Sequence, residues 1–166
     1  MSNIFFIGDT HFCHSNLIKF PTGRTMFKSI WEHDEELIRR WNNTVNEKDV
    51  IYHLGDVIFN RNLGDKILNE LKGIKKLILG NHDTYKNEFY LRYFTKLYGV
   101  KYFGRDCILT HIPIHPCQFP RFKLNIHGHL HHGHLPDKRY FNTCCDHWNF
   151  TPIPVEKIEE RLREIS

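Results

Sequence analysis

The stretch "IFFIGDTH", residues 4–11, joins a short apolar run to a glycine and then to two side chains that can bind a metal ion. A run of four apolar residues is too short for a helix and is typical of a buried β-strand. Gly8 allows a sharp turn where that strand ends. In extended backbone, Asp9 and His11 would point to the same side and Thr10 to the other. The stretch therefore predicts a strand that ends in a polar site.

The same arrangement recurs four more times along the chain. Further apolar runs occupy residues 49–54, 75–79, 106–110 and 123–126. The polar side chains that follow these runs are Asp56, Asn81, His82, Asp83, His111, His129 and His131. Sites in an α/β sheet form at the carboxyl ends of the strands. We therefore expect these side chains and the Asp9–His11 pair to lie along one edge.

Helical patterns separate or follow the apolar runs. Apolar side chains recur at helical spacing in residues 31–45, 64–73, 87–99 and 154–165. Alternating strands and helices predict an α/β domain with a largely parallel sheet in its first half, and the second half is richer in short apolar runs. No linker, repeat or low-complexity segment interrupts the chain. We therefore expect a single domain over residues 1–166.

The composition limits the cellular setting and the partners. Among 166 residues, 23 Lys and Arg oppose 19 Asp and Glu, and this formal net charge of +4 is compatible with anionic substrates. Five cysteines without Cys-x-x-Cys spacing predict a reducing compartment. No run approaches the ~20 apolar residues of a membrane span, and the first apolar run is too short for a signal peptide. We expect a cytoplasmic protein without a membrane partner.

The tract "NIHGHLHHGH", residues 125–134, contains five histidines. His129 and His131 repeat the spacing of Asp9 and His11, and we expect the same extended geometry. The tract contains three other histidines, His127, His132 and His134. We interpret them as residues that surround the metal ligands or are solvated, with contact to the substrate as the alternative. His53 lies inside an apolar run and is interpreted as a hydrogen-bonded core histidine.

The number of candidate ligands is consistent with two metal ions. Seven residues carry suitable oxygen or nitrogen donors: Asp9, His11, Asp56, Asn81, His111, His129 and His131. Two metal ions with four protein ligands each need eight positions, and one bridging carboxylate fills two of them. Such donors without thiolate suit Mn²⁺, Fe, Ni²⁺ or Zn²⁺. Paired metal ions about 3.5–4 Å apart are a recurrent device for phosphoryl displacement.

In these motifs the sequence resembles the calcineurin-like metallophosphoesterases, whose pattern is D-x-H, G-D, G-N-H-D/E, a lone H and G-H-x-H. The five motifs occur here in that order at residues 9–11, 55–56, 80–83, 111 and 128–131. The sequence also resembles small phage and bacterial members of that family, through "DTHFCHSN" (9–16), "YHLGD" (52–56) and an ending near "N...D.WN..P" (142–152). The resemblance implies a four-layer α/β/β/α sandwich and a metal-dependent phosphoric ester hydrolase.

The resemblance also implies a role for each matching residue. The first metal ion would be held by Asp9, His11 and His131. The second would be held by Asn81, His111 and His129, with Asp56 bridging the two. His82 would act on the substrate phosphate or the leaving oxygen, and Asp83 would orient it. His14 and Asn16, which recur in the resembling subgroup, are candidate substrate contacts. Arg24 is either a phosphate contact or a surface arginine.

These observations predict a binuclear phosphoesterase that uses two divalent ions, with Mn²⁺ favoured, and a metal-bridging hydroxide. Phosphodiesters such as small or cyclic nucleotides are the favoured substrates, because a monoester dianion would need cationic clamps and only Arg24 and Arg61 are candidates. The alternatives are a nuclease or RNA-end phosphatase bound to nucleic acid, a phosphomonoesterase, and a non-catalytic scaffold such as the retromer subunit of this fold. The oligomeric state stays open between monomer and homodimer.

Overall fold

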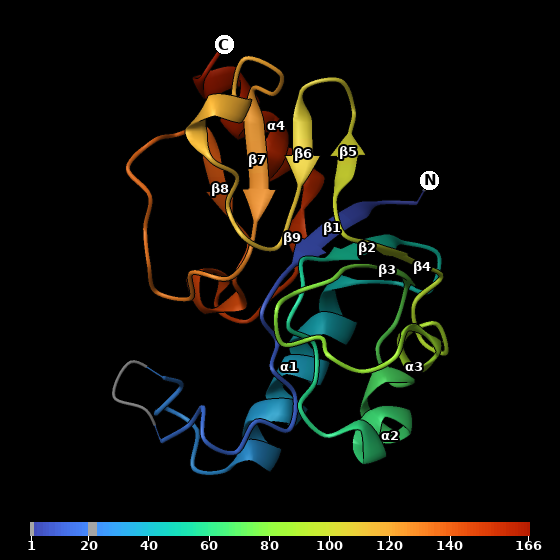
Figure 1. Cartoon of the computed structure of the whole chain (residues 1–166). Helices are drawn as coiled ribbons and strands as arrows, with labels where there is room; N and C mark the ends of the chain where they lie inside the picture. Colours follow the sequence, from blue (N-terminus) through green and yellow to red (C-terminus); the bar gives the residue numbers. More distant parts are fainter. Residues whose placement is uncertain (1, 20–22) are drawn as a thin grey trace.

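The computed structural model describes residues 2–19 and 23–166, and this part of the chain forms two β-sheets with helices around them (Figure 1). The first sheet has the order β4-β3-β2-β1-β9 and the second β5-β6-β7-β8. The strands are β1 (Ile4–Ile7), β2 (Val50–His53), β3 (Ile74–Ile78), β4 (Lys96–Tyr98), β5 (Lys101–Phe103), β6 (Cys107–Leu109), β7 (Leu124–His127), β8 (Tyr140–Asn142) and β9 (Ile153–Pro154). The α-helices are α1 (Ile30–Thr44), α2 (Gly64–Leu68), α3 (Asn87–Tyr90) and α4 (Val155–Glu164), and the 3₁₀-helices are η1 (Arg61–Leu63), η2 (Pro116–Gln118) and η3 (Cys145–Trp148).

Parallel pairing places the strand ends where the sequence patterns predict them. Strands β1 to β4 pair in parallel, as do β6, β7 and β8, while β9 and β5 pair antiparallel with their neighbours. Main-chain hydrogen bonds of Gly8 to Thr143 and Cys145 connect the end of β1 to the segment after β8. The carboxyl ends of strands from both sheets therefore meet, and the predicted α/β class is confirmed.

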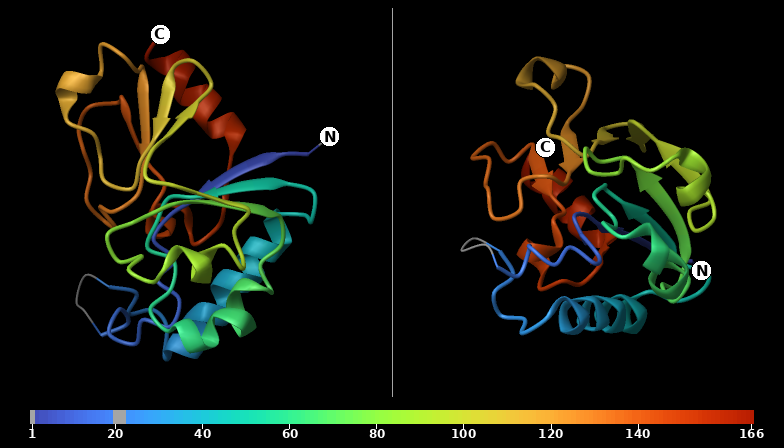
Figure 2. Two further views of the ribbon diagram at one scale, coloured as in Figure 1. Left: turned by 45° about the vertical axis from the view of Figure 1, so that its right-hand side comes forward. Right: turned by 60° about the horizontal axis from the view of Figure 1, so that its bottom comes forward.

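Two hydrophobic cores hold the layers together. One lies between the first sheet and its helices, where Trp41 of α1 and Leu68 of α2 are buried with Ile51 of β2. The other lies between the sheets and includes Phe6 of β1, Ile126 of β7 and Ile158 of α4. Figure 2 shows α1 and α2 beneath the first sheet and α4 beside the second. The sandwich of two sheets flanked by helices agrees with the expected fold.

On its outer face, the second sheet is covered by the loop that carries η2. The hydroxyl of Tyr140 donates to the carbonyl of Ile114 at 2.7 Å, and the ring of Phe119 packs edge to face against that of Tyr140. The side chain of Asn125 accepts a hydrogen bond from the main chain of Ile114 at 3.0 Å. This loop supplies the layer that completes the packing of β7 and β8.

Two predicted helices are shorter than their patterns. The pattern over residues 64–73 gives a helix that ends at Leu68, and the pattern over 87–99 gives only α3. Lys96–Tyr98 forms β4 instead, because Leu79 donates its N–H to the carbonyl of Tyr98 at 2.8 Å and completes the edge of the sheet. Pairing with β3 outweighs the local helical preference. None of the helices in the described ranges is long and apolar enough to cross a membrane.

Candidate metal centre

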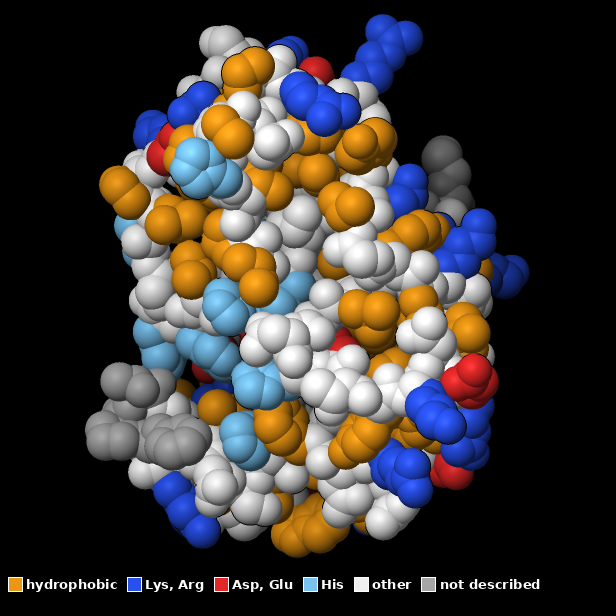
Figure 3. All heavy atoms as spheres, viewed as in Figure 1, with side chains coloured by type: hydrophobic (Ala, Val, Ile, Leu, Met, Phe, Trp, Pro, Cys, Tyr) orange, Lys and Arg blue, Asp and Glu red, His pale blue; other side chains and the backbone are white. Residues whose placement is uncertain are grey.

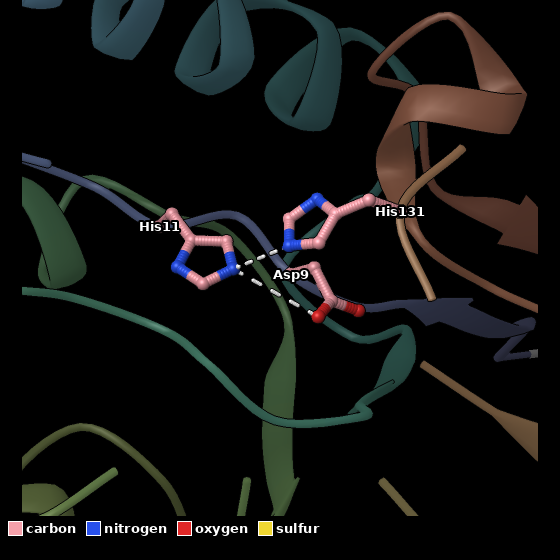
Figure 4. A group of neighbouring side chains, drawn as sticks. All are labelled: Asp9, His11 and His131. Atoms are coloured by element: carbon pink, nitrogen blue, oxygen red, sulfur yellow. Dashed lines mark hydrogen bonds and ion pairs between the residues drawn. The ribbon is translucent and has the colours of Figure 1, made fainter. Parts of the chain in front are cut away.

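The strand ends bring the candidate ligands to one place. Asp9, His11 and His131 offer donor atoms that all lie within 4.8 Å of one another, and so do Asp9, Asp56 and His111. Figure 4 shows the rings of His11 and His131 turned toward each other beside Asp9. The Nε2 atoms of His11 and His131 are 3.2 Å apart, and Nε2 of His11 lies 3.8 Å from Oδ1 of Asp9. Either group could hold a metal ion.

Asp56 lies between two sets of donors. Its Oδ2 atom is 3.7 Å from Nε2 of His11 and 3.4 Å from Nε2 of His111. On the far side, Nε2 of His111 lies 2.8 Å from Oδ1 of Asn81. The ring of His129 packs edge to face against that of His111, with centroids 5.1 Å apart, but it belongs to neither three-donor group of the described residues.

Left-handed backbone, and not extended backbone, aims these side chains. The candidates with positive φ, between 42° and 73°, are Asp9, His11, Asp56, His129 and His131. The expectation of extended geometry at residues 9–11 and 129–131 is therefore wrong. Asp and His accept this conformation more readily than most side chains, yet each instance still costs about 1–3 kcal/mol and needs support from its surroundings. Backbone strain is concentrated at the candidate centre.

Two motif glycines make room for the carboxylates. A Cβ atom on Gly80 would overlap the carboxylate of Asp56, and a Cβ atom on Gly128 would overlap that of Asp9. The main chain therefore approaches each carboxylate more closely than any other residue would allow. This close approach explains why a glycine stands at both positions.

A buried arginine lies behind Asp9 and His131. Arg24 is fully buried, and its guanidinium donates to the carbonyl oxygens of Asp9 and Thr10 and to both oxygens of Asp146, at 2.9 and 3.0 Å. Asp146 in turn accepts a hydrogen bond from Nδ1 of His131 at 3.1 Å. Arg24 is therefore neither an exposed phosphate contact nor a surface arginine. Pro21 and Thr22, which come shortly before it in the sequence, lie outside the described residues.

Asp83 connects two ligand-bearing loops through their main chains. Its carboxylate accepts hydrogen bonds from the N–H groups of Asp56, Val57 and Gly80 at 2.8, 3.0 and 2.8 Å. Among the described contacts, no hydrogen bond joins Asp83 to the ring of His82, so the expected orienting role needs correction. His82 is exposed, its ring lies beside that of His11, and its N–H donates to Oδ1 of Asp56 at 2.9 Å.

Comparison with known proteins shows the family of the chain. The model of the calcineurin-like phosphoesterase family matches residues 2–161. The chain belongs to this family. It is 32% identical to an uncharacterised protein of Methanocaldococcus jannaschii over 99% of this chain and 93% of that protein. It is 24% identical to the gene 66 protein of Mycobacterium phage D29 over 99% and 98% of the two chains. A crystal structure of a protein of unknown function from Aquifex aeolicus matches with a TM-score of 0.80 and 25% identity, covering 96% of this chain and 99% of that one.

Two residues of this phosphoesterase were not expected beside the centre. Asp146 lies behind His131, and the thiol of Cys144 donates to Oδ2 of Asp9 at 2.8 Å. The only sequence signal for Asp146 was the ending shared with small phage and bacterial members. Cys144 is fully buried as well as hydrogen-bonded.

A cavity of about 580 Å³ opens beside the candidate ligands of the phosphoesterase. It is lined by His11, His14, Leu17, Gly23, His82, Leu130, His131, His132, Gly133 and Asp146. Figure 3 shows histidines gathered around a hollow on this face. The ring of His14 stacks on that of Phe59, with centroids 3.9 Å apart, whereas Asn16 is exposed and does not line the cavity. His53 is buried with Nε2 2.9 Å from Oγ1 of Thr10, in agreement with its core interpretation.

The electrostatics of the centre suit a cation. Burial raises the pKa of Asp9 to about 6, although His111 and the Cys144 thiol partly offset this effect. Burial also opposes ionisation of Asp56, but the hydrogen bond and charge of His111 outweigh it and lower the pKa to about 2. A divalent ion at this position would supply the positive charge that the histidines provide to the two carboxylates, and their imidazole nitrogens would be free to bind it. The residues present therefore fit the metal ions that the phosphoesterase family generally binds.

Proposed function

We propose that this phosphoesterase binds two divalent metal ions and hydrolyses phosphodiesters. Membership of the family supports a metal-dependent phosphoric ester hydrolase. One observation carries the two-metal part of the proposal: Oδ2 of Asp56 lies 3.7 Å from Nε2 of His11 and 3.4 Å from Nε2 of His111. A carboxylate between two sets of donors is suited to bridging a pair of ions.

Each ion would have its own set of ligands around the shared Asp56. One set would be Asp9, His11 and His131, and the other Asn81, His111 and His129. Oxygen and nitrogen donors without thiolate suit Mn²⁺, Fe, Ni²⁺ or Zn²⁺, and Mn²⁺ is the ion that we propose. When bound, such ions polarise phosphate oxygens and lower the pKa of water at the site.

His82 is the proposed acid or hydrogen-bond donor. It is exposed beside His11, so its ring can reach the leaving oxygen of a bound ester. The main-chain N–H of His82 donates to Asp56, and Asp83 binds the loops on both sides. These contacts fix the backbone of His82 while its ring stays accessible to substrate.

The distribution of cations supports a diester substrate. Arg24 is buried and bound to Asp146, and Arg61 lines a different cavity. None of the described residues that line the cavity at the centre is a lysine or an arginine. A monoester dianion gains more than a diester monoanion from such charge-assisted hydrogen bonds. Small or cyclic nucleotides are therefore proposed as substrates in preference to monoesters.

The substrate class can be tested on metal-reconstituted protein. We expect higher kcat/KM for bis-p-nitrophenyl phosphate and a 2′,3′-cyclic nucleotide than for p-nitrophenyl phosphate. A monoester advantage above ~10-fold, about 1.4 kcal/mol of transition-state stabilisation, would leave a phosphomonoesterase instead. A strong preference for oligonucleotides in the same panel would indicate a nuclease.

The metal requirement needs a separate experiment. Chelator should abolish activity, and Mn²⁺ or a similar transition metal should restore it, because the proposed ligand set is built from oxygen and nitrogen donors. Elemental analysis verifies that the chelated protein is free of metal. Full activity in protein shown to be metal-free would contradict the mechanism.

A further inference from the structure

The cavity beside the candidate metal centre has a composition that limits what it can bind. It shares His11, His82 and His131 with the centre, so a group attached to a phosphate there can enter it directly. Its volume of about 580 Å³ lies within the usual range of small-molecule sites, roughly 300–1,000 Å³. The cavity is therefore large enough for an organic group of the substrate.

Apolar and small residues form much of the wall between the histidines. Leu17 and Leu130 line the cavity together with two glycines, and Leu17 is buried. The ring of His14 adds a flat aromatic surface to the lining, and its stack on Phe59, with an interplanar angle of 5°, fixes its orientation. Flat rings and aliphatic side chains favour a ring-shaped, weakly polar group.

The described residues that line this cavity include neither a lysine, an arginine nor an unpaired carboxylate that could neutralise a charged group. Within the described lining there is no lysine or arginine, and its carboxylate, Asp146, is engaged by Arg24 and His131. A second phosphate would lack cations to bind it, and an ammonium group would have to compete for a carboxylate already paired. Burying either charge without a partner is costly.

A second cavity, of about 740 Å³, makes the contrast clear. It lies beyond the loop of His82 and contains both signs of charge, with Arg61, Lys86 and Arg92 near Asp65 and Glu88. It shares no residue with the proposed ligand set. The lysine and arginine side chains thus line a different cavity, while the cavity at the centre is suited to an uncharged group.

We infer that the cavity lined by Leu17, Leu130 and His132 binds the uncharged, ring-bearing arm of a phosphodiester. An aryl alcohol and a nucleoside share this chemistry. The inference rests on the proposed diesterase function and adds the class of ester arm that is selected. The arm lies against the leucines and the His14 ring while its phosphate occupies the metal centre.

Three diesters that share a p-nitrophenyl leaving group test the inference: methyl p-nitrophenyl phosphate, phenyl p-nitrophenyl phosphate and thymidine 5′-(p-nitrophenyl phosphate). With metal-reconstituted protein, we expect both ring-bearing arms to exceed methyl by ~10-fold or more in kcat/KM. If no diester is hydrolysed, the proposed function fails. If all three are hydrolysed equally, the function stands and the arm selectivity is overturned.

Variants show whether this cavity produces the selectivity. Leu17→Ala should reduce the advantage of the phenyl and thymidine arms several-fold and leave the methyl ester nearly unchanged. His132→Ala removes an exposed ring of the same wall, so it should act in the same direction without disturbing folding. Leu91→Ala, an exposed leucine that lines neither cavity, is the matched control. If Leu17→Ala and His132→Ala both keep the wild-type selectivity, the cavity does not bind the arm.

Discussion

The two halves of the candidate metal centre are supported by different kinds of contact. Behind Asp9 and His131 lies a buried charged network, in which Arg24 binds the carbonyl of Asp9 and the carboxylate of Asp146. Asp146 then accepts a hydrogen bond from His131. This half depends on side chains that come from distant parts of the chain.

The other half is held mostly by main-chain atoms. Nδ1 of His111 donates to the carbonyl of Leu54 at 2.6 Å, and Asp83 binds the N–H groups of Asp56 and Gly80. A main-chain carbonyl is present whatever the side chain, so substitution cannot remove the support of His111. The first half should therefore be the more sensitive to mutation, although both would hold the same kind of ion.

The largest effect should come from the residue that both halves share. Asp56→Asn removes the negative charge between His11 and His111, so both ions should be lost and activity should fall to background, because the metal ions supply the chemistry at this site. Elemental analysis and kcat/KM measure the two outcomes. Asp106→Asn, at an exposed carboxylate paired with Lys123, is the matched control. Retention of two ions by Asp56→Asn would mean that the halves share no ligand.

A smaller effect is expected at His82, which lies beside both halves and belongs to neither. His82→Ala should keep both ions and lose ~10²–10⁴-fold in rate, the usual contribution of a general acid or base. Metal content and kcat are measured on the same preparation, with the exposed His134→Ala as control. If His82→Ala lost an ion, His82 would be a metal ligand and would belong to one of the two halves.

Substitutions in the two halves of the centre should lower the free energy of unfolding by different amounts. Arg24→Met leaves the buried Asp146 with His131 but without its arginine partner, so the free energy of unfolding should fall by about 3–5 kcal/mol. Asp83→Asn keeps one carbonyl oxygen as acceptor and should cost less, about 1–3 kcal/mol. Urea denaturation of metal-free protein measures both. Arg92→Met, which breaks an exposed pair with Asp65, should cost about 0–1 kcal/mol and serves as control.

That stability comparison has a clear opposite outcome. If Asp83→Asn destabilises the protein more than Arg24→Met does, main-chain support dominates and the proposed contrast is reversed. The double substitution Arg24→Met with Asp146→Leu should recover part of the loss, because it removes both buried charges together.

The strands could be predicted because each apolar run carries its own signal. The run at residues 4–7 and the run at 49–54 became β1 and β2, with the polar residues at their ends as expected. Strand β4 could not be predicted, because residues 96–98 become a strand only by pairing with β3. The sequence around residues 96–98 has a helical pattern, but the tertiary contact with β3 makes this segment a strand.

The candidate ligands could be predicted from motif order, but their support could not. Arg24 and Asp146 are 122 positions apart, and no local pattern in one sequence shows that they pair. The left-handed backbone of Asp9 and His11 was not predicted. The spacing of two residues shows whether their side chains point in the same direction only when the backbone conformation is known. Motif order therefore predicted which candidate side chains would gather, while packing determines their orientation and their supporting contacts.

The smallest expected effect gives the sharpest test of whether the halves are independent. Asp146→Asn keeps an oxygen that can accept from Nδ1 of His131 but removes the charge that pairs with Arg24. Loss of such an outer partner typically lowers metal affinity ~10–100-fold. Calorimetric titration of metal-free protein with Mn²⁺ should therefore show one weakened binding step and one unchanged step. Asp137→Asn, at a surface carboxylate paired with Arg139, should alter neither step. Equal weakening of both steps would show that the charged network supports the whole centre through Asp9, and an unchanged titration would show that it supports the fold but not metal binding.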